Sequence, residues 1–331
     1  MPSGPTHARR FNVRDYLSRD ELRELTTRSD ARGLLEVAFT WGVIAATLAI
    51  VARYPSVWTV GPALVILGGR QLALAVLTHD AAHGILTRSR RLNDAVGRWL
   101  CGLPNNVSMR RYWQHHRRHH LLTGTDDDPD LALVAGYPTT PARLARRFAR
   151  DLLGVSSAKR VFAVVMMGIG RMRYSASTDV EWIDTSGRSW GTAIGTGLRH
   201  LGPIALVNLV GFSITWLAGA PWLFALWWAA YMTTYSALLR VRSIAEHGCT
   251  EPGPDPLRNT RTTTPGPLAR FLLAPHGVGY HLEHHMVMTV PCYNLPRMHR
   301  LLRERGALRG ALVSPGYAAV LRDVTRPAAA A

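Results

Sequence analysis

Histidines in short groups are the residues of this sequence whose type and spacing could do chemistry. His79 and His83 stand four residues apart in THDAAHG, and YHLEHHM places His281, His284 and His285 at positions i, i+3 and i+4. Side chains three and four residues apart share one face of a helix, with Cβ atoms about 5–6 Å apart. Two imidazoles at that spacing can reach one metal ion, and three can serve two adjacent ions.

A third dense group, in YWQHHRRHH, supports two registers. His115 and His119 repeat the spacing of the first group, whereas His116, His119 and His120 repeat that of YHLEHHM. The comparison with YHLEHHM selects the triple. His115 then lies about 100° around the helix from His116, so we expect it beside the ligands or at the membrane interface rather than on the metal. His247 forms a fourth group by itself, in RSIAEHG.

Four other histidines receive a simpler interpretation. A lone histidine in a membrane protein is generally a hydrogen-bonded polar residue or an interfacial one, and we assign that role to His7, His200, His276 and His299. A single pair at i, i+4 could be explained in the same way. Three groups in the order HxxxH, HxxHH and HxxHH on one side of a membrane favour metal binding instead.

The number of imidazoles bears on the kind of metal. Imidazole suits zinc, copper, iron and nickel, and eight or nine nitrogen ligands are too many for one ion. Zinc hydrolases generally use three protein ligands and an open position, and the HExxH motif is absent from the sequence. Two redox-active ions beside a membrane fit oxygen chemistry better.

Apolar segments must position these histidines. Crossing the hydrocarbon core takes roughly 20 mostly apolar residues in a helix. Four segments approach that length and form two hairpins with short turns: 34–52, 56–78, 201–219 and 221–239. Arg70 lies inside the second segment and is expected to reach the interface or to face the bundle interior. A shorter apolar stretch, 161–170, fits either a helix in the interface plane or a buried helix.

Positive charge predicts the orientation. Residues 1–33, the long segment after the first hairpin and the C-terminal segment are rich in arginine, whereas the two hairpin turns carry almost none. We therefore expect an all-α integral membrane protein of the cytoplasmic membrane, with both termini and a histidine-bearing helical cap in the cytoplasm. The expected parts are an N-terminal segment 1–33, a membrane domain 34–305 with its cap from 79–200 and 240–305, and a tail 306–331.

Composition limits the classes of partner. A net charge of +17 and an isoelectric point near 11.0 favour an anionic membrane face, nucleic acid or an acidic protein. No zinc finger or RNP motif is present, so we expect no nucleic acid partner. The cysteines Cys101, Cys249 and Cys292 are too few for a disulfide framework, which favours a reducing compartment. The first 33 residues lack an apolar h-region, so no cleavable signal peptide is expected.

The sequence resembles the membrane fatty acid desaturase and hydroxylase superfamily. The resemblance covers roughly residues 34–305 and rests on three ordered boxes, HDAAH from His79, HRRHH from His116 and HLEHH from His281, together with the two hairpins and His247. It implies a non-haem di-iron site held by His79, His83, His116, His119, His120, His247, His281, His284 and His285. It also implies O₂ as co-substrate and attack on an unactivated C–H bond of a lipid acyl or sphingoid chain. We expect desaturation, with hydroxylation as the alternative.

One position departs from a branch of that superfamily. In acyl-CoA desaturases an asparagine one helical turn before the single histidine helps to hold a metal-bound water, and here Ser243 stands at that place. Serine can still orient a water, and Glu246 can fix the tautomer of a neighbouring histidine. Acyl lipids and sphingoid lipids are therefore as open as acyl-CoA.

Carboxylates near the boxes are candidates to hydrogen-bond the ligands. A metal-bound histidine commonly donates its second N–H to a carboxylate or carbonyl. Asp80, Glu283 and the run containing Asp126, Asp127, Asp128 and Asp130 could accept such bonds. The run can equally be a solvated loop in which Asp128 and Pro129 turn the chain.

Electrons must come from a separate donor such as a ferredoxin or cytochrome with its reductase, since no GxGxxG fingerprint, CxxC pair or fused haem loop is present. Arg110, Arg111, Arg117 and Arg118 could steer an acidic donor or grip an anionic headgroup. Two other classes were considered. A metal transporter or sensor needs ligands near the bilayer midplane, where these spans have almost none. A zinc hydrolase would contain zinc without iron.

Overall fold

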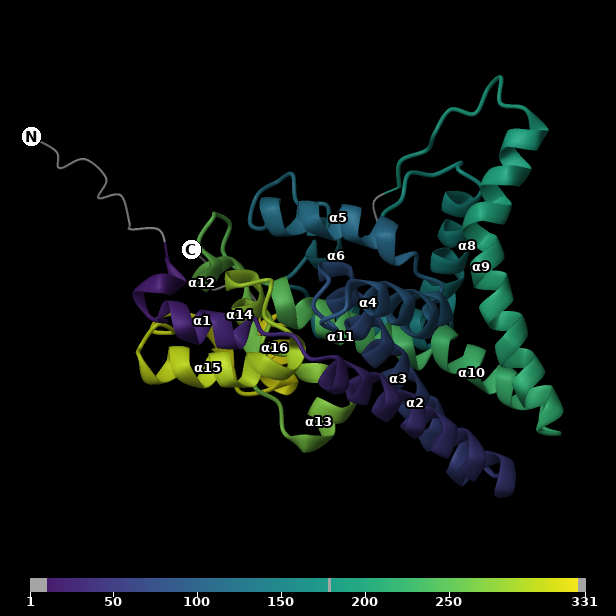
Figure 1. Ribbon diagram of the computed structural model, residues 1–331, viewed down its shortest axis with the longest axis horizontal. Coiled ribbons are helices and arrows are strands. Elements are labelled where there is room, and N and C mark those ends of the chain that lie inside the picture. Colours follow the sequence, from purple (N-terminus) through teal and green to yellow (C-terminus); the bar gives the residue numbers. More distant parts are fainter. Residues whose placement is uncertain (1–10, 178–179, 327–331) are drawn as a thin grey trace, which may run out of the picture.

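The computed structural model describes residues 11–177 and 180–326, and its first hairpin consists of two long helices (Figure 1). Helix α2 (Asp30–Arg53) begins at Ser29, whose side chain accepts a hydrogen bond from the Arg32 amide. Its buried residues recur every three or four positions, which is the period of one helix face: Gly33, Val37, Thr40, Ile44, Thr47 and Val51. Leu35 and Phe39 point outward, as expected of a helix that faces lipid.

Helix α3 (Val57–His83) is the central helix of the fold, because its second half is buried on all sides. Gly68 explains how closely the second hairpin approaches it. A Cβ at Gly68 would collide with the Thr234 hydroxyl and the Tyr235 backbone nitrogen. Arg70 faces the interior at 1% exposure, where its guanidinium donates to the Phe271 carbonyl and lies 4.1 Å from the centroid of the Phe271 ring.

The second hairpin departs from the expected pair of spans. Helix α9 (Trp190–Leu217) begins earlier than residue 201, and the expected span 221–239 is divided between α10 (Trp222–Met232) and α11 (Thr234–His247). Thr233 leaves helical geometry at φ −119° and ψ −85°, and the Thr234 hydroxyl donates to the Leu64 carbonyl of α3 at 2.5 Å. Within residues 11–177 and 180–326, three helices are long and apolar enough to cross a membrane: α2, α3 and α9.

Short helices form the cap around the ends of α3 and α11. After α3 come α4 (Arg90–Val96), a π-helical turn η2 (Gly97–Gly102), η3 (Leu103–Asn105), α5 (Met109–Leu122), α6 (Leu131–Val134), α7 (Pro141–Leu152) and α8 (Val155–Gly168). After α11 come α12 (Pro256–Asn259), α13 (Pro267–Leu272), η4 (Pro275–Gly277), α14 (His281–Met286), η5 (Cys292–Asn294), α15 (Leu295–Glu304) and α16 (Tyr317–Asp323). The chain begins with η1 (Val13–Asp15) and α1 (Arg19–Leu25).

A small sheet departs from the all-α expectation. Strands β1 (Arg261–Thr263) and β2 (Leu312–Ser314) pair in parallel, with Thr262 opposite Val313. This pairing connects the segment before α14 to the C-terminal region, so it fixes the chain just upstream of the third histidine group.

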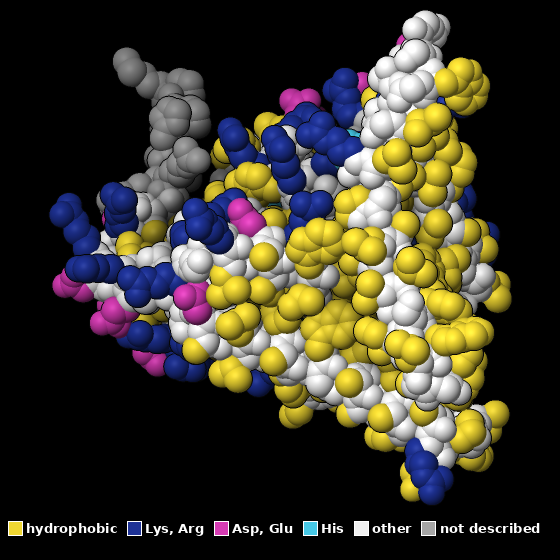
Figure 2. Space-filling view, turned by 45° about the vertical axis from the view of Figure 1, so that its right-hand side comes forward, with side chains coloured by type: hydrophobic (Ala, Val, Ile, Leu, Met, Phe, Trp, Pro, Cys, Tyr) yellow, Lys and Arg dark blue, Asp and Glu magenta, His cyan; other side chains and the backbone are white. Residues whose placement is uncertain are grey.

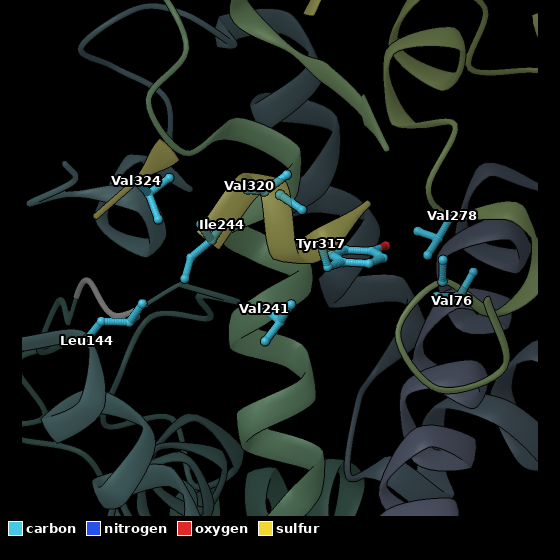
Figure 3. Close-up of a cluster of buried hydrophobic side chains, with 10 residues drawn as sticks. Val76, Leu144, Val241, Ile244, Val278, Tyr317, Val320 and Val324 are labelled. Carbon is cyan, nitrogen blue, oxygen red and sulfur yellow. The ribbon is translucent and has the colours of Figure 1, made fainter. Parts of the chain in front are cut away.

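Both end segments contribute to buried clusters. Tyr317, Val320 and Val324 pack against Val241 and Ile244 of α11, as Figure 3 shows. The described part of 306–331, expected to be a tail, therefore contains β2 and α16 and belongs to the core. Likewise, part of the N-terminal segment is buried, because Leu17 and Leu25 pack against residues of α15.

The surface has two kinds of region. Arginines gather over the cap, whereas hydrophobic side chains spread over the long helices (Figure 2). The stretch 161–170 falls mostly in α8, where Met167 is buried and Phe162 is 53% exposed. Helix α8 therefore combines one packed face with one exposed apolar face.

Candidate metal centre

The first histidine pair stands at the end of α3. The helix ends at His83 because Gly84 adopts a left-handed conformation at φ +72°, and its N–H bonds back to the Ala81 and Asp80 carbonyls. His79 and His83 lie one turn apart on the same face, with ring centroids 4.7 Å from each other.

Three more elements bring histidines to the same place. Helix α5 carries the second group, α14 the third, and α11 ends at His247. The segment around β1 links α11 to α14, because the Asn259 carbonyl lies 3.0 Å from His247 Nδ1 and the Thr262 hydroxyl donates to Glu283 at 2.5 Å.

The nine histidines expected as ligands lie together in two groups. One nitrogen of each residue lies within 4.8 Å of the others in its group. The groups mix the sequence boxes: the first contains His79, His83, His116, His120 and His284, and the second contains His119, His247, His281 and His285. Helix α5 contributes to both groups, so it stands between them. Each group could hold one metal ion.

Ring nitrogen atoms inside the groups lie close together, and several of them have no hydrogen-bond partner. His247 donates from Nδ1 to the Asn259 carbonyl, and His281 Nδ1 faces a Glu246 carboxylate oxygen at 3.5 Å. The Nε2 atoms of these two rings lie only 2.9 Å apart. The Nε2 atoms of His79 and His83 are buried and have no hydrogen-bond partner. Buried acceptors without donors are costly, and a bound cation removes that cost, so the residues fit a metal.

Burial keeps these imidazoles neutral. It lowers the pKa of His247 to about 3 and that of His120 to about 2, and it holds the pKa values of His281 and His284 well below the usual range. His119 is different, because its hydrogen bond to Asp128 and the charges of Asp130 and Asp128 outweigh burial and raise its pKa. Neutral imidazoles present lone pairs, which is the form that binds metal.

Two of the expected carboxylates contact ligand candidates. Asp80 accepts from His79 Nδ1 at 3.1 Å, and its other oxygen accepts from the Cys292 amide at 3.0 Å. Asp128 accepts from His119 Nδ1 at 2.8 Å. Both carboxylates fix the ring tautomer that leaves Nε2 free to face its group.

The other candidates are placed differently. Asp127 is exposed on the loop after α5, and Asp126 is exposed beside it. The Ser243 hydroxyl donates to the Leu239 carbonyl one turn earlier, so its hydrogen is directed to its own helix. Glu246 faces His281 but pairs mainly with Arg242 at 2.6 Å. Glu283 is fully buried on the side away from the groups, where it accepts from His299 at 2.6 Å and from Thr262 at 2.5 Å.

Two contacts of the ligand candidates could not be predicted from the sequence. The Asn259 carbonyl is a backbone group, so its residue type predicts nothing. Tyr112 stacks on His116 with ring centroids 5.1 Å apart, one helical turn away. Its i, i+4 spacing was visible in the sequence, but aromatic residues near a membrane are too common to single it out.

The remaining histidines among residues 11–177 and 180–326 lie outside the two groups. His115 bonds to Asp130 at 2.8 Å, and His276 lies between Glu36 at 2.8 Å and Thr40 at 2.9 Å. His299 bonds to Glu283, and His200 lies on α9 beside a cavity described below. His7 lies outside the described residues.

The profile of the family described as "Fatty acid desaturase" matches residues 55–317, which span all the histidines of both groups. The chain belongs to the fatty acid desaturase family. It is therefore an oxidoreductase of a membrane desaturase and hydroxylase superfamily, and its apolar helices agree with a membrane protein.

Similarity to individual desaturase relatives is low but extends over most of the chain. Dihydrorhizobitoxine desaturase of Bradyrhizobium elkanii is 25% identical over 304 residues, covering 87% of this chain and 77% of the relative. A beta-carotene ketolase of Paracoccus sp. (strain N81106 / MBIC 01143) is 26% identical over 226 residues, 68% of this chain and 73% of the relative. The sn-1 acyl-lipid omega-3 desaturase (ferredoxin) of Nostoc sp. (strain 36) is 25% identical over 270 residues, covering 76% of this chain and 70% of the relative.

Proposed function

We propose that this desaturase-family chain oxidises an unactivated C–H bond of a lipid acyl or sphingoid chain with O₂, and that the product contains a new C=C bond. The observation that carries the proposal is the pair of histidine groups, five and four imidazoles, gathered where α3 and α11 end. Imidazole suits iron among other metals, and membership of the desaturase family supports iron.

The nine histidines of the two groups would hold two iron ions, which supply activation of O₂ for hydrogen removal from an unactivated C–H bond. The chain's own residues prepare the site. Asp80 and Asp128 hold the N–H of His79 and His119, so that each Nε2 stays unprotonated.

The overall reaction needs an electron donor. Desaturation takes one hydrogen from each of two adjacent carbons, two electrons and two protons from outside, and reduces O₂ to two waters. The donor would be a separate ferredoxin or cytochrome with its reductase, approaching from the cytoplasm. One relative's name includes ferredoxin, which supports the first of these. The arginines gathered over the cap support a cytoplasmic cap and an acidic partner.

Oxygen insertion is the second candidate. With the same donor it would place one oxygen atom in the C–H bond and reduce the other to water. The similarity to a beta-carotene ketolase favours it, because that relative's name denotes formation of a ketone.

Expression in a host with few lipid species tests the proposal. Total lipids from cells with the unaltered chain and with His284→Ala are compared by mass spectrometry, and metal content is measured on the purified proteins. We expect a product two mass units lighter only with the unaltered chain, together with iron. A gain of 16 mass units would select oxygen insertion. Zinc without iron, with activity in the absence of O₂, would refute both.

A further inference from the structure

A cavity of about 380 Å³ lies between α5, the end of α8 and the early turns of α9. Arg111, His115 and Arg118 of α5 line one side, and Tyr174 and His200 line the other. Its volume is within the range of small-molecule sites and too small for a whole lipid.

The spacing of four arginines on α5 divides them between two faces. Arg111 and Arg118 are seven residues apart and share the cavity face with His115, whereas Arg110 and Arg117 lie one residue earlier on an exposed face. Seven residues are close to two helical turns, so each pair points in one direction. The cavity therefore receives two of the four cations.

These two cations lack a counter-charge among the described residues. Arg173 at the rim already pairs with Glu181 at 3.0 Å. Arg111 is half-buried, with its guanidinium donating to the Met167 carbonyl at 3.1 Å and lying 5.1 Å from the centroid of the Tyr174 ring. Partial burial of its side chain lowers the pKa of Arg111. An oxyanion at this place would be bound by charge-assisted hydrogen bonds.

Apolar side chains form part of the lining, next to the polar Gln114 and Thr196. Met167 and Met172 are 7% and 2% exposed, and Ile183 completes that side. A lining with both cations and apolar side chains fits an amphiphile better than a free anion, because the alkyl carbons next to the headgroup also gain burial.

The cavity wall leads to the second histidine group. His115 bonds through Nε2 to Asp130 Oδ1 at 2.8 Å, and the other Asp130 oxygen lies 3.7 Å from His119 Nδ1. A headgroup in the cavity would thus be separated from a candidate metal ligand by the side chains of His115 and Asp130.

We propose that this cavity binds an oxyanionic headgroup, a carboxylate or a phosphate, of the lipid whose chain the enzyme oxidises. The inference rests on the proposed function for the identity of the chain, and it adds the substrate class: a lipid with a negatively charged headgroup. Arg111 and Arg118 bind the oxyanion, and the methionines cover the first alkyl carbons.

Crosslinking tests the site without turnover. The full-length protein, purified with its metal and reconstituted in neutral-lipid nanodiscs, receives three probes of equal chain length, an alkyl carboxylate, an alkyl phosphate and an alkyl alcohol, each with a diazirine beside the headgroup. Labelled peptides are identified by mass spectrometry. We expect the anionic probes to label α5 and residues 167–174, with the alcohol about tenfold weaker.

Single substitutions of arginines on α5 test which side chains bind the anionic probes. Arg118→Gln removes one cavity charge from an exposed side chain, so packing is unaffected, and it should lower labelling by the anionic probes about tenfold. Arg111→Gln, verified by an unchanged Tm, should do the same. Arg117→Gln removes an equal charge from the other face of α5 and should leave labelling as in the unaltered protein.

Several results would overturn the assignment. Equal labelling by the alcohol, or equal loss in Arg117→Gln, would mean that the cavity does not select charge. Displacement of the alkyl phosphate by an equal concentration of inorganic phosphate would show a site for free anions. If Arg111→Gln and Arg118→Gln kept full labelling but lost electron transfer from an acidic ferredoxin, the two arginines would serve to bind the electron donor. Absence of any oxidised lipid, with selective labelling intact, would instead refute only the proposed function.

Discussion

His119 Nδ1 and Asp128 Oδ1 lie 2.8 Å apart, although Asp128 follows α5 in a loop of exposed neighbours. The same oxygen accepts from the Asp130 amide at 2.9 Å, so the loop turns back onto the helix that it leaves. Only one residue of the acidic run 126–128 is buried, and it is the one that reaches a ligand candidate.

We predict that Asp128→Asn lowers metal affinity about tenfold, the lower end of the effect of losing a carboxylate behind a metal-bound histidine. Asparagine keeps an acceptor for the Asp130 amide but removes the charge that faces His119. Iron retention during dialysis against a graded chelator measures the change. Asp127→Asn is the matched control, because Asp127 is exposed, and equal losses in both variants would contradict the assigned role.

Two neighbouring histidines on α5 should differ in effect. His116→Ala removes a member of the first histidine group and is expected to abolish activity and lower iron content. His115→Ala removes a side chain that bonds to Asp130 instead, and most iron should remain. Metal analysis of both purified variants makes the comparison. Iron loss in His115→Ala with iron retained in His116→Ala would reverse the register of this box.

Removal of metal should destabilise the protein. Without a cation, the buried Nε2 atoms of His79, His83 and His285 have no hydrogen-bond partner. Each such buried group costs about 1–3 kcal/mol, so we expect the Tm to fall by several degrees on chelation and to recover with added Fe²⁺. The variant His284→Ala, already deficient in ligands, should lose less on chelation. An unchanged Tm of the unaltered protein would show that the histidines are satisfied without metal.

The contact between α3 and α11 depends on the absence of a side chain at Gly68. Gly68→Ala would push a methyl group into the Thr234 hydroxyl and the Tyr235 backbone, and should lower the free energy of unfolding by about 1–3 kcal/mol. Because α11 carries His247 at its end, iron content should fall as well. Thermal unfolding and metal analysis measure both effects.

Gly42→Ala on α2 is the control for that substitution. Nothing lies within 4 Å of a Cβ at Gly42, so the change only adds a better helix former at an exposed position. Stability should stay equal or rise. A loss in Gly42→Ala as large as that in Gly68→Ala would show that the close approach is unimportant.

Local periodicity made much of this protein predictable. The i, i+3 and i+4 spacing places histidines on one helix face wherever the helix goes, and all nine expected residues lie in the two groups. Apolar length likewise predicted α2, α3 and most of α9. The turns between the paired helices, after α2 and after α9, also lie where short turns were expected.

Relations between distant segments were not predictable in the same way. The break at Thr233 depends on a hydroxyl at Thr234 that reaches Leu64, 170 positions earlier. The burial of α16 depends on α11 presenting Val241 and Ile244 to it. Glu283 was expected to support ligands, but His299 and Thr262 draw its carboxylate to the opposite side.

The sequence by itself determined which residue types could bind metal and on which helix faces they stand, because that geometry is set within a few residues. Only the tertiary structure decided how the imidazoles are shared, with His116 and His120 in one group and His119 in the other. It also decided that a backbone carbonyl, at Asn259, holds His247. The physical reason is that a ligand group is completed by the relative orientation of α3, α5, α11 and α14, which depends on packing between helices far apart in the chain.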